Sequence, residues 1–155
     1  MQYNLPDNMV KMIASAGYGE NRGQGEGAMM HTISSVYNRF GQREWANKSV
    51  PEVLQDGFYA VKDAASGKNS GFSDAMNGKF KSEADENEYK KWFVKTAAIN
   101  RGTIEPTDTQ FYFKQPEINR LVKNKGFDFS KVEEGEPFNT KVNGRSVKFR
   151  TFHYK

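Results

Sequence analysis

Residues 15–39 read SAGYGENRGQGEGAMMHTISSVYNR, and this stretch decides how the N-terminal part of the chain folds. The apolar residues before and at its start recur at helical spacing: Met9, Met12, Ile13 and Ala16. Asp7 is the predicted N-cap of this helix, and one further turn reaches Glu20. Glycines at 23, 25 and 27 then interrupt the pattern. A carboxylate therefore stands between the apolar face of a helix and a flexible joint.

The apolar pattern resumes after the joint and predicts a second helix over residues 26–40. Its predicted core face consists of Met29, Met30, Ile33, Val36, Tyr37 and Phe40. Another, polar face contains Gly27, His31, Ser34 and Asn38.

Capping signals predict two more helices. The segment SVPE, residues 49–52, is a capping box with proline in the first turn, so a short helix should run to Gly57. Ser82 caps a long helix over residues 83–101, which Gly102 ends. Between the two, residues 58–61 indicate a partly extended segment. Residues 62–81 indicate a loop with one turn near residues 73–78, and such a long loop is often a binding rim.

The C-terminal third is predicted to form a strand at TQFYF (residues 109–113) and a helix over residues 116–126 that Pro116 opens and Gly126 closes. A hairpin follows over residues 138–152 about Asn143-Gly144. The predicted fold class is α+β, mainly helical, with a small β-hairpin and sheet formed by the C-terminal part.

The composition fits a single domain spanning residues 1–155. The chain is 36% hydrophobic and 14% aromatic, which suits a packed core and is unlike a disordered chain. It has no cysteine, which excludes disulfides, thiolate nucleophiles and cysteine-ligated zinc, and its two histidines lie far apart. We expect no metal and no organic cofactor.

The chain carries a net charge of +4, and the basic excess lies in residues 106–155, which hold 10 basic and 6 acidic side chains. Such a surface favours a polyanionic partner, either nucleic acid or an acidic bacterial envelope. The start, MQYNLPDNMVKM, lacks the pattern of a signal peptide, and no stretch approaches the roughly 20 apolar residues that span a bilayer. We expect a chain made soluble without a signal peptide, without membrane insertion, and acting as a monomer.

Glu20 has the properties of a general acid. A carboxyl on the apolar side of a helix end loses hydration in its charged form, and this raises its pKa toward neutral pH. The alternative is structural: Glu20 pairs with Arg22 or Arg39 and ends the helix.

The sequence around Glu20 resembles the signature of the SleB-like cell wall hydrolases, a Tyr-Gly-Glu-x-Arg-Gly segment followed by a helix that ends in Asn-Arg. The residues that match in order are Tyr18, Gly19, Glu20, Arg22, Gly23, Gly27, Asn38 and Arg39. Similar blocks are SVPEVLQDGFYAV, PTDTQFYF and KFRTFHYK, so the resemblance covers roughly the whole chain. Two positions depart from the family: it usually has Gln in place of Gly57 and a small hydroxyl residue in place of Tyr59.

The resemblance implies the lysozyme-like fold of the spore-cortex-lytic catalytic domain. It implies an enzyme that cuts the β-1,4 bond between N-acetylmuramic acid and N-acetylglucosamine in the peptidoglycan glycan strand. Family members are often lytic transglycosylases, in which a single glutamate, here Glu20, acts as acid and then as base. The alternative, a muramidase-type hydrolase, needs a second carboxylate. Glu26 is the nearest in sequence, although an acid there more simply opens the second helix.

The other predicted site residues bind or support the substrate. The resemblance assigns this role to Tyr18, Arg22, Asn38 and Arg39. Asn38 and Arg39 have an alternative role at the negative end of the helix dipole. Tyr59 and Tyr112 present aromatic faces for sugar rings, whereas Phe111 and Phe113 should fill the core. His31 and His153 are expected to be solvated or hydrogen-bonded rather than catalytic.

Two other classes of protein compete with an enzyme. The segment KVNGRSVKFRTF interleaves basic and aromatic residues as some single-strand nucleic-acid binders do, but that interpretation leaves Glu20 without a purpose, and we expect no nucleic-acid partner. The second competing class is a non-catalytic virion component. The expected setting is the bacterial cell wall, attacked by a bacteriophage endolysin or a virion-associated enzyme, with a bacterial remodelling enzyme as the alternative.

Overall fold

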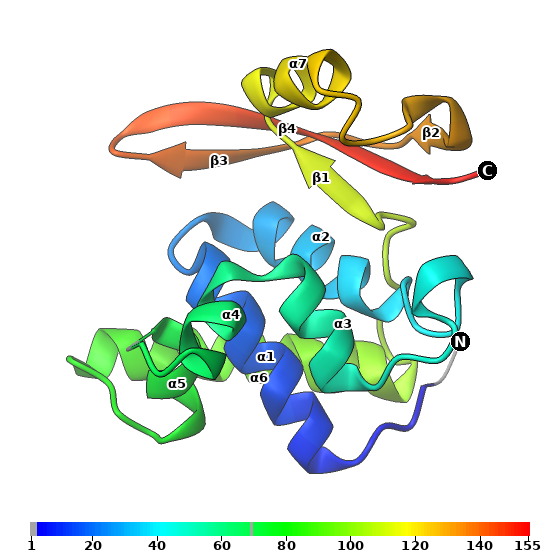
Figure 1. The fold of residues 1–155 in the computed structure, drawn as a ribbon. Coiled ribbons are helices and arrows are strands. Elements are labelled where there is room, and N and C mark those ends of the chain that lie inside the picture. The colour runs from blue at the N-terminus through cyan, green and yellow to red at the C-terminus, as the bar shows by residue number, and fades with distance from the viewer. Residues whose placement is uncertain (1–2, 69) are drawn as a thin grey trace.

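The computed structural model describes residues 3–68 and 70–155, which form seven α-helices, two 3₁₀ turns and four β-strands. The predicted N-terminal start at Met1 and Gln2, and Asn69 within the predicted loop, lie outside the described residues. The fold is α+β, mainly helical, with a small antiparallel sheet formed by the C-terminal part, as predicted. Helices lie on one side of the molecule, and the sheet with one helix lies on the other (Figure 1).

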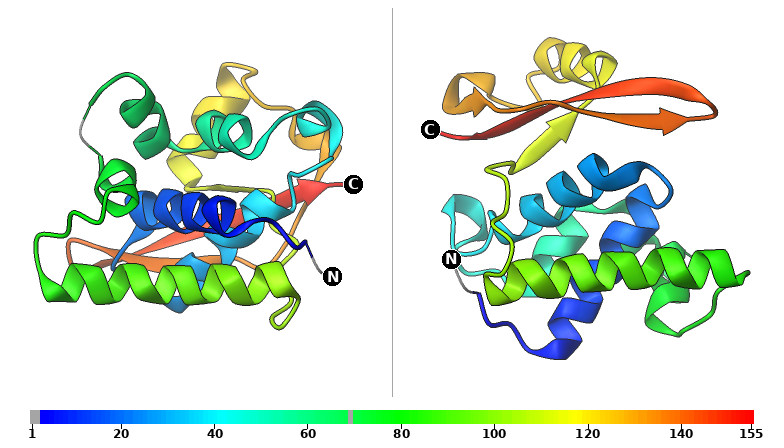
Figure 2. Two further views of the ribbon diagram at one scale, coloured as in Figure 1. Left: turned by 90° about the horizontal axis from the view of Figure 1, so that it is seen from below. Right: turned by 180° about the vertical axis from the view of Figure 1, so that it is seen from behind.

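The helical part precedes the sheet in sequence. It consists of α1 (Asp7–Asn21), α2 (Gly25–Tyr37), the 3₁₀ turn η1 (Arg43–Trp45), α3 (Val50–Gly57), α4 (Tyr59–Ala65), α5 (Gly71–Met76) and α6 (Glu83–Arg101). Helix α1 contacts α2, α4, α5 and α6, and the long α6 runs across the back of this part (Figure 2). Capping explains two of the boundaries: Ser49 and Glu52 form the predicted capping box of α3, and Ser82 caps α6.

The sheet is built around one long strand. Its elements are β1 (Phe111–Phe113), α7 (Gln115–Lys123), the 3₁₀ turn η2 (Phe129–Lys131), β2 (Val132–Glu134), β3 (Phe138–Val142) and β4 (Arg145–Tyr154). Strand β4 pairs antiparallel with the other three, with β1 on one side and β2 on the other. The predicted hairpin turn is confirmed, because Asn143 and Gly144 have φ angles of 51° and 77°, the left-handed pair of a type I′ turn. Figure 1 shows α7 on the face of the sheet away from the helical part.

Hydrogen bonds from the predicted polar face of α2 fix the segment that leads into β1. Asn38 Nδ2 donates to the carbonyl oxygens of Thr107 and Thr109, at 2.6 and 2.9 Å. The hydroxyl of Ser34 accepts from the backbone N–H of Thr107 at 2.9 Å. His31 Nδ1 lies 2.7 Å from the Thr109 hydroxyl, so this histidine is buried and hydrogen-bonded rather than solvated. The polar face of α2 therefore holds the sheet in place against the helices.

Two apolar clusters stabilise the two parts. The larger lies among the helices and includes the fully buried Tyr18, Tyr37, Phe58 and Trp92. The smaller joins the sheet to η1, α3 and α7 through Trp45, Val53, Phe111, Ile118, Val132 and Phe152. Phe40 packs against both clusters. No helix among the described residues has the length and hydropathy needed to span a membrane.

Five predicted local features are wrong. Pro6 is the N-cap residue of α1, and Asp7 is its first helical residue without a side-chain cap bond. The second helix ends at Tyr37 and α7 ends at Lys123, each three residues before its predicted end. Residues 59–61 are helical in α4; only Phe58 is extended. Much of the predicted loop over residues 62–81 is helical too, because it continues α4 and contains α5, which packs on α1.

Candidate active site

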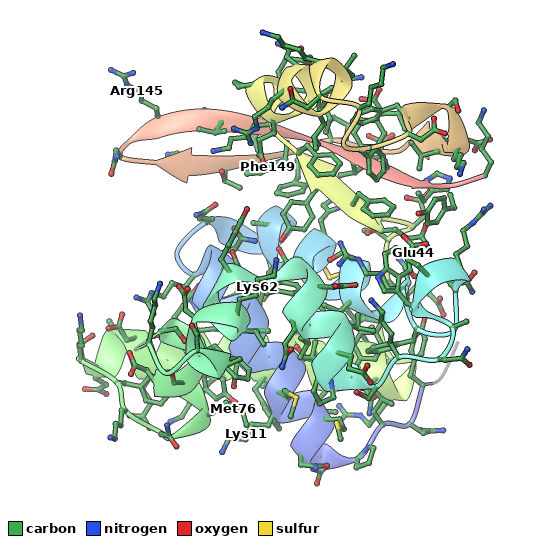
Figure 3. All side chains as sticks on the ribbon, viewed as in Figure 1. Lys11, Glu44, Lys62, Met76, Arg145 and Phe149 are labelled. Carbon is green, nitrogen blue, oxygen red and sulfur yellow. The ribbon has the colours of Figure 1, made fainter. Side chains whose placement is uncertain are left out.

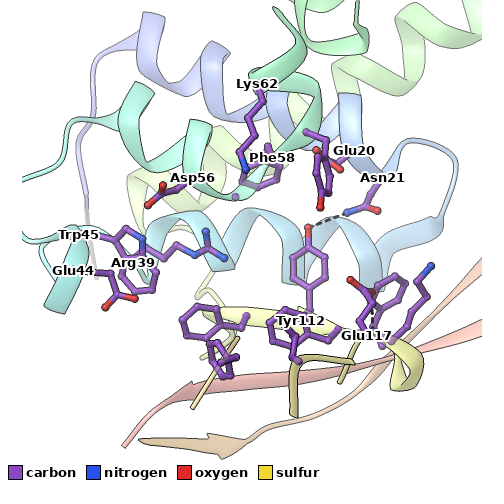
Figure 4. A pocket seen from close by; sticks show the side chains of 18 residues that line it. Glu20, Asn21, Arg39, Glu44, Trp45, Asp56, Phe58, Lys62, Tyr112 and Glu117 are labelled. Atoms are coloured by element: carbon purple, nitrogen blue, oxygen red, sulfur yellow. Dashed lines mark hydrogen bonds between the residues drawn. The ribbon is translucent and has the colours of Figure 1, made fainter. Parts of the chain in front are cut away.

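A groove with a volume of about 570 Å³ runs between the helical part and the sheet. The helical side contributes Glu20, Asn21, Arg39, Phe58, Tyr59 and Lys62, among others. The sheet side contributes Phe111, Tyr112, Phe113, Lys114, Glu117 and Phe149. Figure 3 shows Lys62 and Phe149 on opposite sides of this groove, and Figure 4 shows its lining side chains from close by.

Glu20 lies in the last turn of α1, half-buried at the wall of the groove. Its Oε1 atom accepts a hydrogen bond from the backbone N–H of Ala60 at 3.1 Å. Ala60 lies in the first turn of α4, where backbone N–H groups have no partner within the helix and attract anions. The carboxylate at the end of α1 is therefore held by the start of α4.

Burial raises the pKa of Glu20 above its ordinary value, because the charged carboxylate loses hydration. Hydrogen bonds from the backbone of Ala60 and Tyr59 lower the pKa, but by less than burial raises it. The negative charge of Asp63 adds to the rise, and the positive charge of Lys62 opposes it. The predicted direction of the shift is thus confirmed, and its cause is desolvation.

Glu20 forms no ion pair within residues 3–68 and 70–155, so the pairing with Arg22 or Arg39 that the structural alternative predicts is absent there. The guanidinium of Arg22 lies over the ring of Tyr18, 4.9 Å from its centroid. Arg39 lies farther along the groove. The carboxylate of Glu20 is therefore available to a ligand in the groove.

Gly19 allows α1 to pack closely against α4 and α5. A Cβ atom at this position would lie 2.9 Å from the Cβ atom of Ala60 and 2.9 Å from the backbone nitrogen of Phe72. Any larger residue would push α4 and α5 away from α1. Gly19 therefore sets the distance between Glu20 and the α4 backbone that holds it.

Tyr112 brings its hydroxyl from the sheet to the neighbourhood of Glu20. Asn21 Nδ2 donates to this hydroxyl at 3.3 Å (Figure 4). It also lies 2.8 Å from the hydroxyl of Thr32, to which it donates as well. Burial raises the pKa of the Tyr112 phenol, and the charge of Glu20 raises it further. We predicted Tyr112 for a cleft, and it lines the groove. Phe111 and Phe113, which we predicted for the core, belong to or pack on the smaller cluster and also line the groove.

Arg39 and Tyr59, two of the predicted substrate-binding residues, also line the groove. Tyr59 is 76% exposed, beside Glu20 at the start of α4, and Lys62 Nζ lies 5.5 Å from its ring centroid. Arg39 is buried, with its guanidinium 5.2 Å from the ring centroid of Trp45 and 5.4 Å from that of Phe111.

The other three predicted substrate-binding residues lie outside the groove lining. Tyr18 is a core residue, 2% exposed, packed edge-on against Phe80 and Tyr89. Arg22 is exposed and covers Tyr18. Asn38 donates its hydrogen bonds to backbone carbonyl groups of the segment before β1. These three motif residues support the fold around Glu20, since their contacts are with the core and with the backbone before β1.

Several carboxylates besides Glu20 line the groove, and Glu26 is not one of them. Glu26 lies in the first turn of α2 and pairs with Lys95 at 2.9 Å, which agrees with its structural interpretation. The groove contains Glu44, which accepts from the Tyr154 hydroxyl at 2.7 Å, and Asp56, which pairs with Lys48. It also contains Glu117, which accepts from the backbone N–H of Lys114 at 3.1 Å and caps α7.

The sequence interpretation missed Asn21, Trp45, Phe58, Lys62, Lys114 and Phe149 as groove residues. Asn21 had a local signal, since it follows Glu20 on the same helix. The others come from segments far apart in sequence, and only the packing of the sheet on the helices brings them together. His31 and His153 lie outside the groove lining. Among the described residues, no group of three or more acidic or histidine side chains is arranged to hold a metal ion.

Comparison with known proteins identifies no relative that could indicate the function of this groove. The groove and its carboxylate must therefore support any functional conclusion, together with the short motif around Glu20. The chain matches no protein-family model, no curated protein and no solved structure at a significant level.

Proposed function

We propose that this chain is a peptidoglycan-degrading enzyme that cleaves the bond between N-acetylmuramic acid and N-acetylglucosamine, with Glu20 as general acid and base. The observation that carries the proposal is a half-buried carboxylate with a raised pKa at the wall of the groove, free of any ion pair among the described residues. A glycosidase needs a carboxyl whose pKa is raised, because its protonated form donates to the leaving oxygen.

The groove suits an extended saccharide. Aromatic side chains line it from both sides, among them Tyr59 on the helical side and Tyr112 and Phe149 on the sheet side. Aromatic faces pack well on the C–H faces of sugar rings. The proposal includes the lysozyme-like fold that the SleB-like resemblance implies, and it is supported by the groove between a helical part and a small sheet, with the acid at the end of a helix.

The proposed reaction needs one carboxyl group. Protonated Glu20 gives its proton to the glycosidic oxygen, and the bond from that oxygen to C1 of the muramoyl residue breaks. The 6-hydroxyl of the same residue then forms a bond to C1, while the Glu20 carboxylate takes the proton of that hydroxyl. The products are a 1,6-anhydro end and a free saccharide, and Glu20 is protonated again.

A hydrolase is the alternative within the same class. It would use a second carboxylate, and Glu117 and Asp56 line the same groove. Each already has a partner, in the α7 cap and in Lys48. The single-glutamate mechanism therefore fits better.

The nucleic-acid alternative agrees less well with the charges of the groove. Four acidic residues line it, Glu20, Glu44, Asp56 and Glu117, together with three basic ones, Arg39, Lys62 and Lys114. The groove therefore lacks the excess of positive charge that attracts a nucleic-acid backbone, and a nucleic-acid partner is left with the exposed basic residues of the hairpin, such as Arg145 at its tip (Figure 3). A non-catalytic virion component remains the other alternative. We place the activity at the bacterial wall, in phage-mediated lysis or penetration.

The test is a digest of purified peptidoglycan by the unchanged protein and by Glu20→Gln, with the released muropeptides measured by mass spectrometry. Products about one water lighter than reducing ends indicate a lytic transglycosylase, and reducing ends indicate a hydrolase. Glu26→Gln is the matched control, because it removes the same charge outside the groove. Digestion by Glu20→Gln at the rate of the unchanged protein would falsify the mechanism. No products from any of the proteins would leave a binding or structural role.

A further inference from the structure

Arg39 is a buried cation at one end of the groove. It follows α2 and is 9% exposed, yet it belongs to the groove lining. Its Nε atom donates to the carbonyl oxygen of Gln110 at 3.0 Å, and its guanidinium lies near the rings of Trp45 and Phe111. Figure 4 shows the guanidinium directed along the groove, toward its middle. The rings of Trp45 and Phe111 and the hydrogen bond to Gln110 fix the orientation of the guanidinium.

No carboxylate within residues 3–68 and 70–155 forms an ion pair with Arg39. The two acids nearest to this end of the groove already have partners: Glu44 accepts from Tyr154, and Asp56 pairs with Lys48. Arginine stays charged in proteins, and a buried charge is stable when it is paired. An anionic group on a ligand would complete this arrangement, and a planar guanidinium is suited to a carboxylate.

Gly57 makes room for the guanidinium. A Cβ atom at position 57 would lie 2.4 Å from Arg39 Nη1, so any other residue would displace the guanidinium. Position 57 is also one of the two positions at which the chain departs from the SleB-like pattern.

We propose that Arg39 is a subsite for a carboxylate carried by the muramoyl residue of the glycan strand. This inference rests on the proposed function. The carboxylate has two sources: the free lactyl group of a muramoyl residue without a peptide stem, or an acidic group of the stem itself. N-acetylglucosamine has no such group, so the subsite distinguishes muramoyl-containing strands from neutral saccharides and sets the direction in which a strand lies in the groove.

The experiment is a calorimetric titration of Glu20→Gln, which keeps the groove and prevents turnover. Three probes are compared: a stem-free muramoyl–glucosaminyl tetrasaccharide, its lactyl methyl ester, and the same saccharide with peptide stems. The titrations are repeated with Arg39→Gln and with Gly57→Ala added. Gly27→Ala is the control, because its Cβ meets only an ordinary contact with Phe138 at 3.6 Å.

We expect one carboxylate-bearing probe to bind about tenfold more tightly than the methyl ester, the size of one charge-assisted hydrogen-bonded pair. The preference should disappear in Arg39→Gln and in Gly57→Ala, and persist in Gly27→Ala. Tightest binding of the stem-free saccharide identifies the lactyl group, and tightest binding of the stem-bearing saccharide identifies the stem. Gly57→Ala keeps the buried charge, so it tests the subsite even where Arg39→Gln fails to fold.

Two results overturn the subsite. One is that Glu20→Gln with Arg39 unchanged binds the two carboxylate-bearing probes and the methyl ester equally well; the other is that it binds none of the three probes. The peptidoglycan digest separates these results from the proposed function. Digestion without a carboxylate preference leaves the enzyme and removes the subsite. An Arg39-dependent preference without digestion keeps the subsite and removes the enzyme.

Discussion

The carboxylate of Glu20 accepts the backbone N–H of Ala60 at 3.1 Å, so the end of α1 is joined to the start of α4. The two charged neighbours of Glu20 lie on α4 as well, one turn farther along. The position and the protonation of the proposed catalytic carboxyl therefore depend on a helix that follows it by forty residues.

Two substitutions on α4 should shift the pH profile of glycan cleavage in opposite directions. The rate should fall as the pH rises through the pKa of Glu20, because the first step needs the protonated acid. Lys62 lowers this pKa and Asp63 raises it. Lys62→Met should therefore move the alkaline limb of kcat/KM to higher pH, and Asp63→Asn should move it to lower pH.

The measurement is the initial rate of peptidoglycan solubilisation between about pH 4 and pH 8 at constant ionic strength, because exposed charges are screened by salt. Both shifts should shrink as salt is added. Shifts of the same sign in the two variants would contradict the assignment of this limb to Glu20.

Removal of the Glu20 charge should not destabilise the folded protein at neutral pH. The pKa of Glu20 is raised on folding, so the folded protein binds this proton more tightly than the unfolded chain. The stability that protonation supplies is complete below the unfolded pKa and is lost as the pH rises through the folded pKa. Above the folded pKa the buried carboxylate is ionised and lowers the stability of the fold, and Glu20→Gln relieves this cost while its amide oxygen still accepts from Ala60.

Thermal unfolding of the two proteins at pH 7 and at pH 4 checks this. We expect the melting temperature of Glu20→Gln to be equal to or higher than that of the unchanged protein at pH 7, with a smaller difference at pH 4. A melting temperature several degrees lower at pH 7 would show that the ionised carboxylate stabilises the fold.

Much of the fold follows from local signals in the sequence. The capping box at Ser49, the cap at Ser82 and the Asn143-Gly144 turn each depend on neighbours within a few residues, and all three are present. Residues 59–65 lack such a signal, since α4 has no side-chain cap and is stabilised by its packing on α1. Its helical structure, which brings Ala60 to Glu20, could not be predicted from local pattern.

The same distinction applies to the candidate site. Glu20 is marked by its own neighbours in sequence, and the raised pKa follows from its place at the apolar end of a helix. Arg39 was predicted as a site residue, but its aromatic slot requires Trp45 and Phe111, which meet only when the sheet packs on the helices. Tyr18 and Asn38 carry the same motif signal as Glu20, yet they support the fold, because a motif does not separate contact with substrate from contact with the core.

The Tyr112 hydroxyl should contribute to stability as well as to the site. It accepts from Asn21 Nδ2, whose other bond goes to Thr32. Tyr112→Phe leaves the ring in place and removes this acceptor, and we expect a loss of about 1 kcal/mol in the free energy of unfolding. Urea denaturation measures it, with Tyr59→Phe as the control, since Tyr59 is mostly exposed. Equal stability of Tyr112→Phe and the unchanged protein would show that the 3.3 Å contact contributes nothing.

Two glycines of the motif region should respond to alanine with opposite signs. A Cβ atom on Gly17 would lie 2.6 Å from a ring carbon of Trp92, which is 1% exposed in the main core. Because that ring is held on all sides, Gly17→Ala forces overpacking and should cost about 1–3 kcal/mol. Gly27 is exposed near the start of α2 without a positive φ, so Gly27→Ala should stabilise by about 0.5 kcal/mol through the entropy of the unfolded chain. Urea denaturation of the two variants compares them directly. A stable Gly17→Ala protein would mean that α1 and α6 can separate at this crossing, and the close packing that positions the end of α1, and Glu20 with it, would then be looser than the contacts indicate.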